Sequence, residues 1–566
     1  MSIKSIVKRY WPLLLVLLIA GVIRFYGLLQ NPISLYSDEV DMGYQALSLL
    51  KTGCDYSGFC FPVQFHSFSD VQPPLPIYFI AFTHLVGVPL DLSIRLTSAI
   101  FGLLGILVTY LLVEKLASKN IFNLRLPGIG LISAVLLTII PWHVTYSRIG
   151  FSLTTLYFFV TLGFLFFTEY LIKRKNSFLY LSCFFLGLSP MVYNTAKVAV
   201  VFYPFILLLL PGAEGLFKKN TNIKIAFAAM FIPLIVMFAA GGTTARFDYI
   251  SIFTDPTAAP EVKYQRQQDS GPTLVVGTTP SIFTDLFHNK PLFYANNLSN
   301  NFFSLISTKF LFTTGDPNLR QSIGGWGMLY HSLFPILLIG IYFLIRFRHD
   351  RLLLFLSLQI LVATSTSIVT RDGAEHASRS FMMILPLIII CSAGIAYLKQ
   401  SSKILFYLFF AALLVESIFY FHDYWIHFPY TSERSFSAGM KELIQEVKKY
   451  HGQPVIISPK NDNPLIFYAF YTKYDPKKFQ QLVKTNTLYR NQGLDKFNLD
   501  GNRIGDTNLY IASLIDYKKG PAGSLPGAIY FLTKGEFDTS GVSSVAQVSD
   551  IIRLPSGEPL YYEIHY

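Results

Sequence analysis

A short acidic segment near the N-terminus holds the residue types best suited to chemistry. Asp38 and Glu39 follow an apolar run, Asp41 comes two residues later, and a helix-like stretch begins at Met42. Paired carboxylates suit general-base work, in which one removes a proton from a hydroxyl and its neighbour orients it or holds a metal. The alternative is an N-cap whose acidic first turn complements the helix dipole.

Three short basic turns complement this acidic segment. They contain Arg148, the stretch from Tyr193 to Lys197, and His376 with Arg379. Arginine forks and a lysine point charge hold phosphate groups, so each turn is a candidate phosphate contact. Phospholipid headgroups would explain any one turn alone. Three such turns beside one acidic segment favour a site where a carboxylate base faces a leaving lipid phosphate, as sugar transfer from a lipid carrier requires.

Two further segments have residues that could bind a sugar or stabilise the fold. Asp316, Arg320 and Trp326 lie in a glycine-containing stretch that suits a sugar-binding surface, or equally a turn with an interfacial aromatic anchor. Cys54 and Cys60 bracket a polar segment, which predicts a short-range disulfide in an oxidising compartment, with two unpaired thiols as the alternative.

Several motifs of other enzyme classes are missing from the sequence. It has no Gly-rich nucleotide loop, no His/Cys metal spacing and no Gly-x-Ser-x-Gly elbow, so soluble nucleotide donors and zinc hydrolysis are disfavoured. No cofactor is required by these residues, and the use of a divalent metal is left open.

The elements that position these residues are membrane helices. Of 566 residues, 52% are hydrophobic and 14% charged, whereas a soluble domain carries roughly 25% charged residues. Apolar runs long enough to cross a hydrocarbon core of about 30 Å recur, which predicts an α-helical polytopic membrane protein with about 11 transmembrane helices. The expected spans are 11–29, 92–113, 127–143, 152–172, 177–191, 198–212, 224–241, 329–345, 352–369, 381–398 and 404–421.

Charge bias fixes the expected orientation. If Pro74–Leu90 does not span, the basic clusters between the apolar runs all fall on one side, which the positive-inside rule makes cytoplasmic, together with the N-terminus. Pro74–Leu90 is then expected to lie along the outer surface or re-enter. The three basic turns and the acidic segment fall on the extracytoplasmic side, and the net charge of +12 is explained without nucleic acid.

The expected domains are a transmembrane core, 1–422, and an extracytoplasmic domain, 423–566. The core carries two large outer loops, 30–91 and 242–328. After residue 422 the composition changes to Lys-rich helical stretches, short β-branched runs and Gly/Pro turns, which predicts a small α/β domain.

Taken together, the chain resembles the membrane glycosyltransferases of the GT-C fold. It is most similar to glycosyltransferase family 39, the protein O-mannosyltransferases and the lipid A aminoarabinose transferase with their prokaryotic relatives. The resemblance covers roughly residues 10–400. It rests on Ser37-Asp38-Glu39, Gln72-Pro73-Pro74-Leu75, Ser147-Arg148, Tyr193 with Lys197, Gly315-Asp316 with Arg320, and His376-Ala377-Ser378-Arg379-Ser380.

The resemblance implies an inverting transfer of a sugar from a polyprenyl- or dolichyl-phosphate donor. The sugar would be a hexose such as mannose, or a pentose, and the acceptor a hydroxyl of a protein, a lipid or a cell-wall glycan. Asp38 maps onto the family's first-loop catalytic aspartate, with Glu39 beside it. The expected donor-phosphate contacts are Arg148, Lys197, Arg379 and His376, and the expected substrate contacts are Asp70, Tyr193, Asp316, Arg320 and Trp326.

Two departures from the family pattern leave metal use and proton transfer open. Gln72 precedes the Pro-Pro pair, where the family often has a charged residue, and an apolar stretch, 149–151, replaces the family's second aspartate. The alternatives are a transporter or flippase of a lipid-linked substrate, which predicts charges buried in mid-span, and a non-catalytic scaffold, which predicts no dependence on Asp38.

Overall fold

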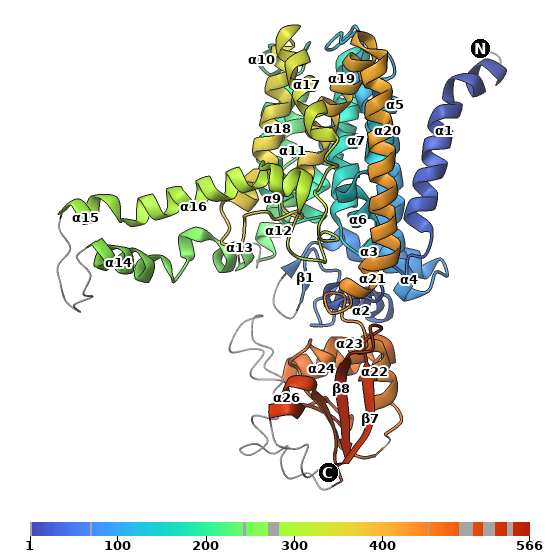
Figure 1. The fold of residues 1–566 in the computed structure, drawn as a ribbon, viewed down its shortest axis with the longest axis vertical. Coiled ribbons are helices and arrows are strands. Elements are labelled where there is room, and N and C mark those ends of the chain that lie inside the picture. The colour runs from blue at the N-terminus through green and yellow to red at the C-terminus, as the bar shows by residue number, and fades with distance from the viewer. Residues whose placement is uncertain are drawn as a thin grey trace.

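The computed structural model describes residues 3–67, 71–241, 245–269, 282–450, 452–485, 502–512, 527–539 and 547–565. Figure 1 shows a helical bundle, a domain containing a sheet at one end of it, and a helical arm that leaves the bundle sideways. The bundle is built from α1 (Ile3–Phe25), α4 (Leu90–Ala117), α5 (Ile129–Ile139), α6 (Pro141–Arg148), α7 (Leu153–Lys173), α8 (Asn176–Leu188), α9 (Ala196–Leu208), α11 (Thr221–Ala229), α12 (Ile232–Ala239), α17 (Leu333–Arg346), α18 (Asp350–Ile368), α19 (Ile384–Ser401) and α20 (Lys403–His422). The short α10 (Leu216–Lys219) precedes α11.

The chain is a multi-pass membrane protein, but the expected count of eleven spans is not confirmed. Within the described residues, six helical segments are long and apolar enough to cross a membrane, or seven if the bent pair α5–α6 is one span. The expected spans 177–191 and 198–212 correspond to α8 and α9, which have 13 residues each. A helix needs about 20 residues to cross the hydrocarbon core, so apolar runs alone overstate the number of full-length spans.

The expected span 127–143 is broken at Pro141. Helix α5 ends at Ile139, and α6 begins at Pro141 with a bend of 59°. Proline has no N–H to continue the helical ladder and is favoured at the first helical position. The bend carries the following residues, up to Arg148, into the interior at one end of the bundle.

A surface layer at that end of the bundle positions the acidic segment. It contains α2 (Ser37–Thr52), the two-stranded antiparallel pair β1 (Phe65–His66) and β2 (Val71–Gln72), and α3 (Pro74–Leu85). Helix α3 has 12 residues, too few to cross a membrane, and it covers most of the segment expected to lie along the surface.

The C-terminal domain is an α/β unit with a mixed six-stranded sheet. The strand order is β4-β5-β3-β6-β8-β7, with β3 parallel to β5 and β6 and the remaining pairs antiparallel. Its elements are α22 (Met440–Val447), β3 (Val455–Ile457), α23 (Pro464–Thr472), α24 (Pro476–Thr485), β4 (Asn502–Arg503), β5 (Leu509–Ile511), β6 (Ile529–Thr533), α26 (Lys534–Thr539), β7 (Gln547–Arg553) and β8 (Pro559–His565). Helix α20 leads into it through a π-helical turn (Asp423–His427) and α21 (Phe428–Thr431).

The C-terminal domain and the surface layer share one hydrophobic core. Buried residues of α2 and α3 form a single cluster with α22, α23 and the sheet. At Gly43 of α2, an added Cβ would lie 2.5 Å from Phe470 of α23 and 2.7 Å from Ile94 of α4. Only glycine allows α2 to pack this closely between the two helices. The domain therefore supports the helix that carries the acidic pair.

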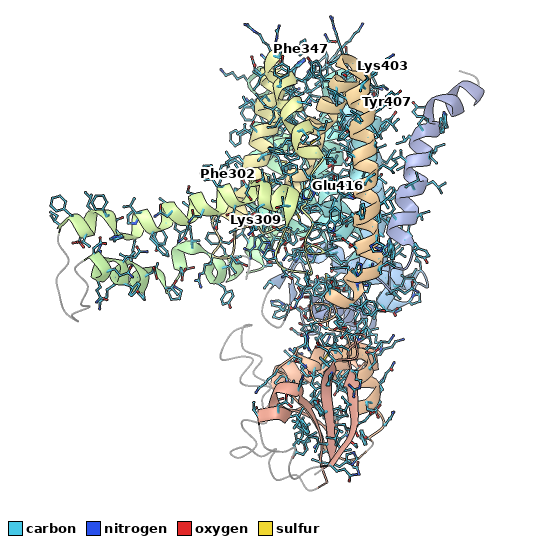
Figure 2. All side chains as sticks on the ribbon, viewed as in Figure 1. Phe302, Lys309, Phe347, Lys403, Tyr407 and Glu416 are labelled. Atoms are coloured by element: carbon cyan, nitrogen blue, oxygen red, sulfur yellow. A yellow bond between two sulfur atoms is a disulfide. The ribbon has the colours of Figure 1, made fainter. Side chains whose placement is uncertain are left out.

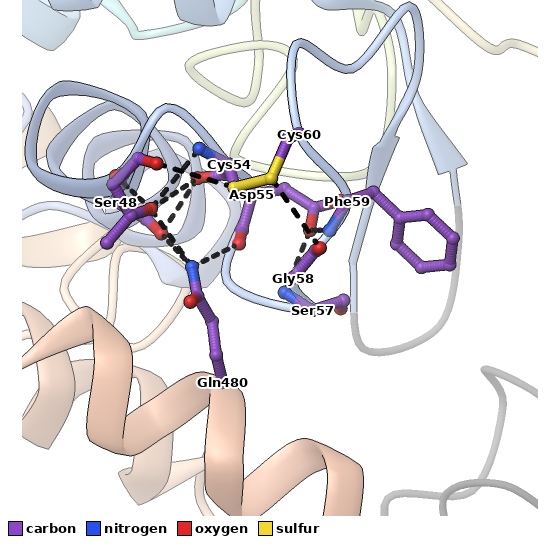
Figure 3. The surroundings of a disulfide bond; sticks show 9 residues. Ser48, Cys54, Asp55, Ser57, Gly58, Phe59, Cys60 and Gln480 are labelled. Carbon is purple, nitrogen blue, oxygen red and sulfur yellow. Dashed lines mark hydrogen bonds between the residues drawn. A yellow bond between two sulfur atoms is a disulfide. The ribbon is translucent and has the colours of Figure 1, made fainter.

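The loop after α2 is closed by the disulfide expected from the sequence. Cys54 and Cys60 are joined, and the amide of Gln480 on α24 donates to the carbonyl of Asp55 at 2.9 Å (Figure 3). Oδ1 of Asp55 accepts hydrogen bonds from two backbone N–H groups of the same loop, those of Ser57 and Phe59, each at 2.9 Å. The disulfide loop is thus a second contact between the surface layer and the C-terminal domain.

Candidate active site

The acidic pair separates at the first turn of α2. Asp38 is exposed and lines a recess, whereas Glu39 is fully buried. Oε2 of Glu39 accepts a hydrogen bond from the backbone N–H of Tyr36 at 3.2 Å, as expected for an acidic side chain in a first turn. The two carboxylates predicted to act together have different surroundings, and Asp38 is the one that reaches the recess.

Glu39 is held by a buried ion pair with Arg95 of α4. Nε of Arg95 donates to Oε1 of Glu39 at 2.8 Å, and Nη2 donates to Oε2 at 2.9 Å. The backbone N–H of Gly150 donates to the same carboxylate at 2.6 Å. A Cβ at Gly150 would lie 2.3 Å from Ile94, so a larger residue would push this segment away from Glu39. The apolar stretch that departs from the family pattern therefore binds Glu39.

The recess beside Asp38 has a volume of about 540 Å³. Its wall comes from α2, the start of α3 and the turns before α7 and α9, and consists of Asp38, Met42, Gln72, Pro73, Pro76, Phe151, Ser152, Tyr193 and Asn194. Within the described part of the chain, two amide oxygens of this wall, Oε1 of Gln72 and Oδ1 of Asn194, are buried without a hydrogen-bond partner. Buried acceptors of this kind are costly unless a ligand or water donates to them. The hydroxyl groups of a sugar would supply such donors.

A buried carboxyl lies directly behind this wall. Nε2 of Gln72 donates to Oδ2 of Asp41 at 2.8 Å. Burial raises the pKa of Asp41 to about 7, although hydrogen bonds with Tyr56, Ser67 and Gln72 oppose that rise. The orientation of Gln72, and with it the free acceptor of the recess, therefore depends on Asp41.

A second, larger hollow adjoins the recess. It has a volume of about 910 Å³ and shares Tyr193 and Asn194 with the recess. Lys197 and Arg379 lie in its wall, and most of the remaining wall is apolar or aromatic, formed by Val198, Phe238, Phe247, Ile250 and Val369 together with Thr195, Thr366 and Thr370. Among the described residues, Lys197 has no ion-pair partner. The hollow thus combines a cationic end with an apolar groove, as the head and chain of a lipid phosphate require.

Arg379 reaches the groove with an anion already beside it. Nη1 donates to Oδ1 of Asp372 at 2.6 Å and Nη2 donates to Oδ2 at 3.1 Å. Burial alone would raise the pKa of Asp372, but hydrogen bonds and charge from Arg379, with the charge of His376, hold that pKa below its usual value. His376 lies 3.8 Å from Asp372 through Nε2 and 3.1 Å from Oγ of Ser378 through Nδ1. His376 therefore supports the loop that carries Arg379.

Tyr193 connects Asp38 to the cationic end of the groove. Burial raises the pKa of Tyr193, the negative charges of Asp38 and Asp372 add to this rise, and the charge of Arg379 opposes it. Asp38 and Arg379 therefore both lie within electrostatic reach of Tyr193. The structure brings both of them close to Tyr193, although the sequence placed the three side chains in separate segments.

Asp316 braces the loop of Arg379 from behind. Oδ2 of Asp316 accepts from the backbone N–H of Ala377 at 2.8 Å, and Oδ1 accepts from that of Asn318 at 2.8 Å. Burial raises the pKa of Asp316 to about 6, although these two N–H groups lower it. Asp316 is therefore placed to position a loop of the site.

Arg320 lies near the first turn of α2. The centre of its guanidinium is 5.2 Å from the centroid of the Tyr36 ring, and Nε donates to the carbonyl of Ser435 at 2.9 Å. Burial raises the pKa of Tyr36, the charges of Asp38 and Glu39 add to this rise, and the charge of Arg320 opposes it. Arg320 thus lies between the acidic segment and the C-terminal domain.

Arg148 is buried and holds the end of α1 together with the segment that follows it. Nη1 and Nη2 donate to four backbone carbonyls within 23–31, at 2.6 to 3.3 Å, and Nε donates to the hydroxyl of Tyr424 at 2.9 Å. The guanidinium also lies 4.5 Å from the ring centroid of Trp425. Because these bonds engage all its nitrogens, the arrangement favours a positioning role for Arg148 over its predicted phosphate contact.

Trp326, another predicted substrate contact, does not line the recess. Nε1 of Trp326 donates to Oδ2 of Asp423 at 2.8 Å, and its ring packs edge-on against Tyr420, 5.6 Å between centroids. Trp326 therefore anchors the end of α20. Asp70 lies outside the described residues.

The sequence did not single out Arg95 and Asn194 as individual residues of the site. Arg95 had a signal, since an arginine inside an expected span is costly and needs a partner. Asn194 had none, because an asparagine in a turn is more often a turn former than a ligand.

The groups that could hold a metal lie elsewhere. Among the described residues, two sets of side chains bring ligand atoms within 4.8 Å of one another, and Asp38 belongs to neither: His422, Asp423 and His427, and Glu446, Asp550 and Glu563. The recess itself offers Asp38 with neutral oxygens.

Comparison with known proteins gives one family-model match and a number of structural likenesses, of which two are described. Residues 71–240 match the family model described as dolichyl-phosphate-mannose-protein mannosyltransferase. No curated protein matches the chain. The chain is similar to the Archaeoglobus fulgidus oligosaccharyltransferase tethered with an acceptor peptide, with 13% identity, a TM-score of 0.47 and coverage of 82% of this chain. The match spans 64% of the length of that protein.

Another likeness is to ArnT from Cupriavidus metallidurans bound to undecaprenyl phosphate. It has 10% identity and a TM-score of 0.41, and it covers 98% of this chain and 97% of that one. The matched family segment, 71–240, supplies Gln72, Tyr193, Asn194 and Lys197 of the two hollows. The resemblance predicted from the sequence is thus confirmed over this segment, which carries the pattern of a membrane glycosyltransferase family.

Proposed function

We propose that this protein transfers a sugar from a polyprenyl-phosphate carrier to an acceptor hydroxyl, with inversion at the anomeric carbon. One observation carries the proposal: a polar recess with Asp38 adjoins an apolar groove with Lys197 and Arg379, and both share Tyr193 and Asn194. The sugar would occupy the recess and the carrier's phosphate and isoprenoid chain the groove. A hexose such as mannose fits the family that residues 71–240 match.

The chemistry follows from this placement. Asp38 removes the proton of the acceptor hydroxyl, whose oxygen forms a bond to the anomeric carbon from the face opposite the phosphate. The bond between that carbon and the phosphate oxygen breaks, and its electron pair stays on the phosphate. Lys197 and Arg379 stabilise the negative charge of the leaving phosphate. Glu39 and Arg148 take no part in these steps and hold the segments around them.

We place the site on the extracytoplasmic face. The start of α1 lies at the end of the bundle opposite the C-terminal domain and α2 (Figure 1). Lys403, and Phe347 between Arg346 and Arg348, lie at that same far end (Figure 2). Basic residues gather on the cytoplasmic side of membrane proteins, which supports a cytoplasmic N-terminus.

The test is transfer by the purified protein in lipid, with labelled polyprenyl-phosphate sugars as donors and native membrane extract as acceptor. General-base catalysis contributes about 10²- to 10⁴-fold, so Asp38→Asn is expected to lower transfer by that factor while donor binding persists. If both proteins bind donor and transfer equally, Asp38 is not the base. If the wild type binds no polyprenyl-phosphate sugar in a sound assay, the transporter or scaffold interpretation replaces this one.

A further inference from the structure

The helical arm that leaves the bundle has exposed apolar side chains that its own fold does not cover. The arm consists of α13 (Ala245–Ile250), α14 (Ala258–Asp269), α15 (Ile282–Phe287) and α16 (Lys290–Leu305). Four side chains of α15 are between 63% and 79% exposed, namely Ile282, Phe283, Leu286 and Phe287. Large exposed apolar patches mark surfaces that contact another protein or a membrane.

The arm is built as two layers of different polarity. Helices α15 and α16 form one layer. It exposes Leu292 and Phe303 in addition to the four apolar residues of α15, and between them it also exposes Asp285, Lys290, Asn296, Ser299 and Asn300. Helix α14 forms the other layer and exposes Glu261, Lys263 and Gln268, with Tyr264 as its exposed aromatic residue. The layers are joined by ion pairs, Arg266 with Asp285 at 2.8 Å and His288 with Asp269 at 2.8 Å.

The direction of the arm fits a membrane surface. It runs across the axis of the bundle, with the α15–α16 layer towards the middle of the bundle and α14 towards the C-terminal domain (Figure 1). Phe302, at the bundle end of α16, lies beside the long helices (Figure 2). If the axis of the bundle runs along the membrane normal, this direction turns the α15–α16 layer towards the acyl chains of one leaflet and α14 towards its headgroups.

The apolar surface of the arm follows in the chain directly after the exposed apolar surface of a candidate membrane span. Helix α12 belongs to a candidate span, Thr221–Ala239, and exposes Ile232 and Ile235 at 56% and 61%. The chain passes from α12 into α13, which exposes Phe247 and Tyr249. This continuity favours lipid over a second protein chain as the occupant of the arm's apolar layer.

The root of the arm is fixed to the loop that carries Arg379. Ser251 and Thr370 form a β-bridge, and the side chain of Arg371 donates to the carbonyls of Ser251 at 3.1 Å and Thr254 at 2.8 Å. Nδ2 of Asn301 donates to the carbonyl of Thr370 at 2.8 Å. The arm is thus attached to this loop at two places, at α16 and at the segment between α13 and α14.

We propose that the arm is an interfacial anchor that lies in the outer leaflet, with the α15–α16 layer in the acyl region and α14 at the headgroups. Amphipathic helices of this kind insert about 5–10 Å into the boundary between headgroups and acyl chains. The anchor fixes the height of the groove wall relative to the leaflet. The choice of the outer leaflet rests on the proposed extracytoplasmic face, but the proposal does not depend on the proposed sugar transfer.

The test places one fluorescent probe on each layer of the full chain in lipid nanodiscs. Phe287→Cys reports the apolar layer, and Gln268→Cys is the matched control on the polar layer. The chain's own cysteines are unsuitable for labelling, because Cys54 and Cys60 are bonded and Cys183 and Cys391 are buried. Quenching is measured with iodide in water and with a quencher attached to the lipid acyl chain, at one protein per disc.

The expected result is that the probe at 287 is quenched several-fold more by the acyl quencher, and several-fold less by iodide, than the probe at 268. Equal access of iodide to both probes would overturn the proposal, because the arm would then lie in water. Protection at 287 without acyl quenching, or protection that appears only with two or more copies per disc, would mean a protein contact and would also overturn it. Sugar transfer need not be active for any of these outcomes.

Discussion

Replacing Glu39 with glutamine tests whether the Glu39 carboxylate stabilises the fold, in contrast to Asp38, which is the proposed catalytic base. Glu39 accepts two bonds from Arg95 and one each from the backbone N–H groups of Gly150 and Tyr36. The variant Glu39→Gln keeps the volume but removes the negative charge. The guanidinium of Arg95 would retain the carbonyls of the segment 28–34 and lose its only buried anion among the described residues.

The expected loss of stability follows from the charge of Arg95, which stays buried without its partner. Removing one partner of a buried ion pair typically costs about 3–5 kcal/mol, because the other charge stays buried without compensation. The matched control is Asp38→Asn on the adjacent residue, whose side chain is exposed in the recess. Unfolding in mild detergent, followed by circular dichroism, should show a large loss of stability for Glu39→Gln and little change for Asp38→Asn.

A double variant tests whether Glu39 and Arg95 stabilise the fold as a pair. Adding Arg95→Met to Glu39→Gln removes the stranded charge, so the double variant should be less destabilised than the sum of the two single variants. Additive losses would mean that the pair does not act as a unit. A Glu39→Gln protein that folds with wild-type stability but transfers no sugar would refute the assignment, since Glu39 would then act in catalysis.

Three further predictions concern the surroundings of the site. Folding raises the pKa of Asp41 from 3.8 to about 7, so between these pH values Asp41 holds a proton in the folded state that it has lost in the unfolded state. The free energy of unfolding should therefore fall as pH rises from about 4 to about 7. Asp41→Asn should flatten that part of the thermal-unfolding profile, and an unchanged slope would contradict the assignment. Loss of the bond between Cys54 and Cys60 in a double serine variant should cost about 2 kcal/mol for so short a loop, measured by unfolding with the reduced wild type as control. Replacing Lys197 by alanine should raise the KM for a polyprenyl-phosphate donor about 10- to 100-fold, because one charged contact to the phosphate is lost, and Lys197→Arg should raise it less. An unchanged KM would mean that Lys197 does not bind the donor phosphate.

Much of the framework was predictable from the sequence. Hydropathy located the bundle, charge bias removed Pro74–Leu90 from the set of spans, and the β-branched runs at 454–458, 509–512 and 528–532 coincide with β3, β5 and β6. The pairing of β7 with β8 was not predicted, because Gln547–Arg553 is mostly polar and only its position at the sheet edge makes it a strand. The count of eleven spans is not confirmed, because some expected spans correspond to helices shorter than a full span, and hydropathy measures composition and not where a helix begins.

The direction of a side chain was the least predictable property of the site. The sequence pattern of a basic residue in a turn is the same whether its side chain faces a ligand or binds backbone carbonyls. In the structure, the predicted phosphate contacts include side chains of both kinds. Lys197 faces the groove, whereas Arg148 is engaged by carbonyls of the segment 23–31. Which use applies is decided by the packing of segments far apart in the chain, and no local pattern records it.

The buried arginines explain how a site made of loops is held in place at the end of a bundle. Arg148 and Arg95 each bind carbonyls of the segment between α1 and α2, from α6 and α4 respectively, so this segment is attached to two helices of the core. Arg95 also forms an ion pair with Glu39, which fixes the first turn of α2 and thereby the adjacent Asp38. From the opposite side, Gly43 lets the C-terminal domain press against the same helix. Asp38 can therefore stay exposed in the recess and yet be held in one position, because the residues around it are bound from both the bundle and the domain.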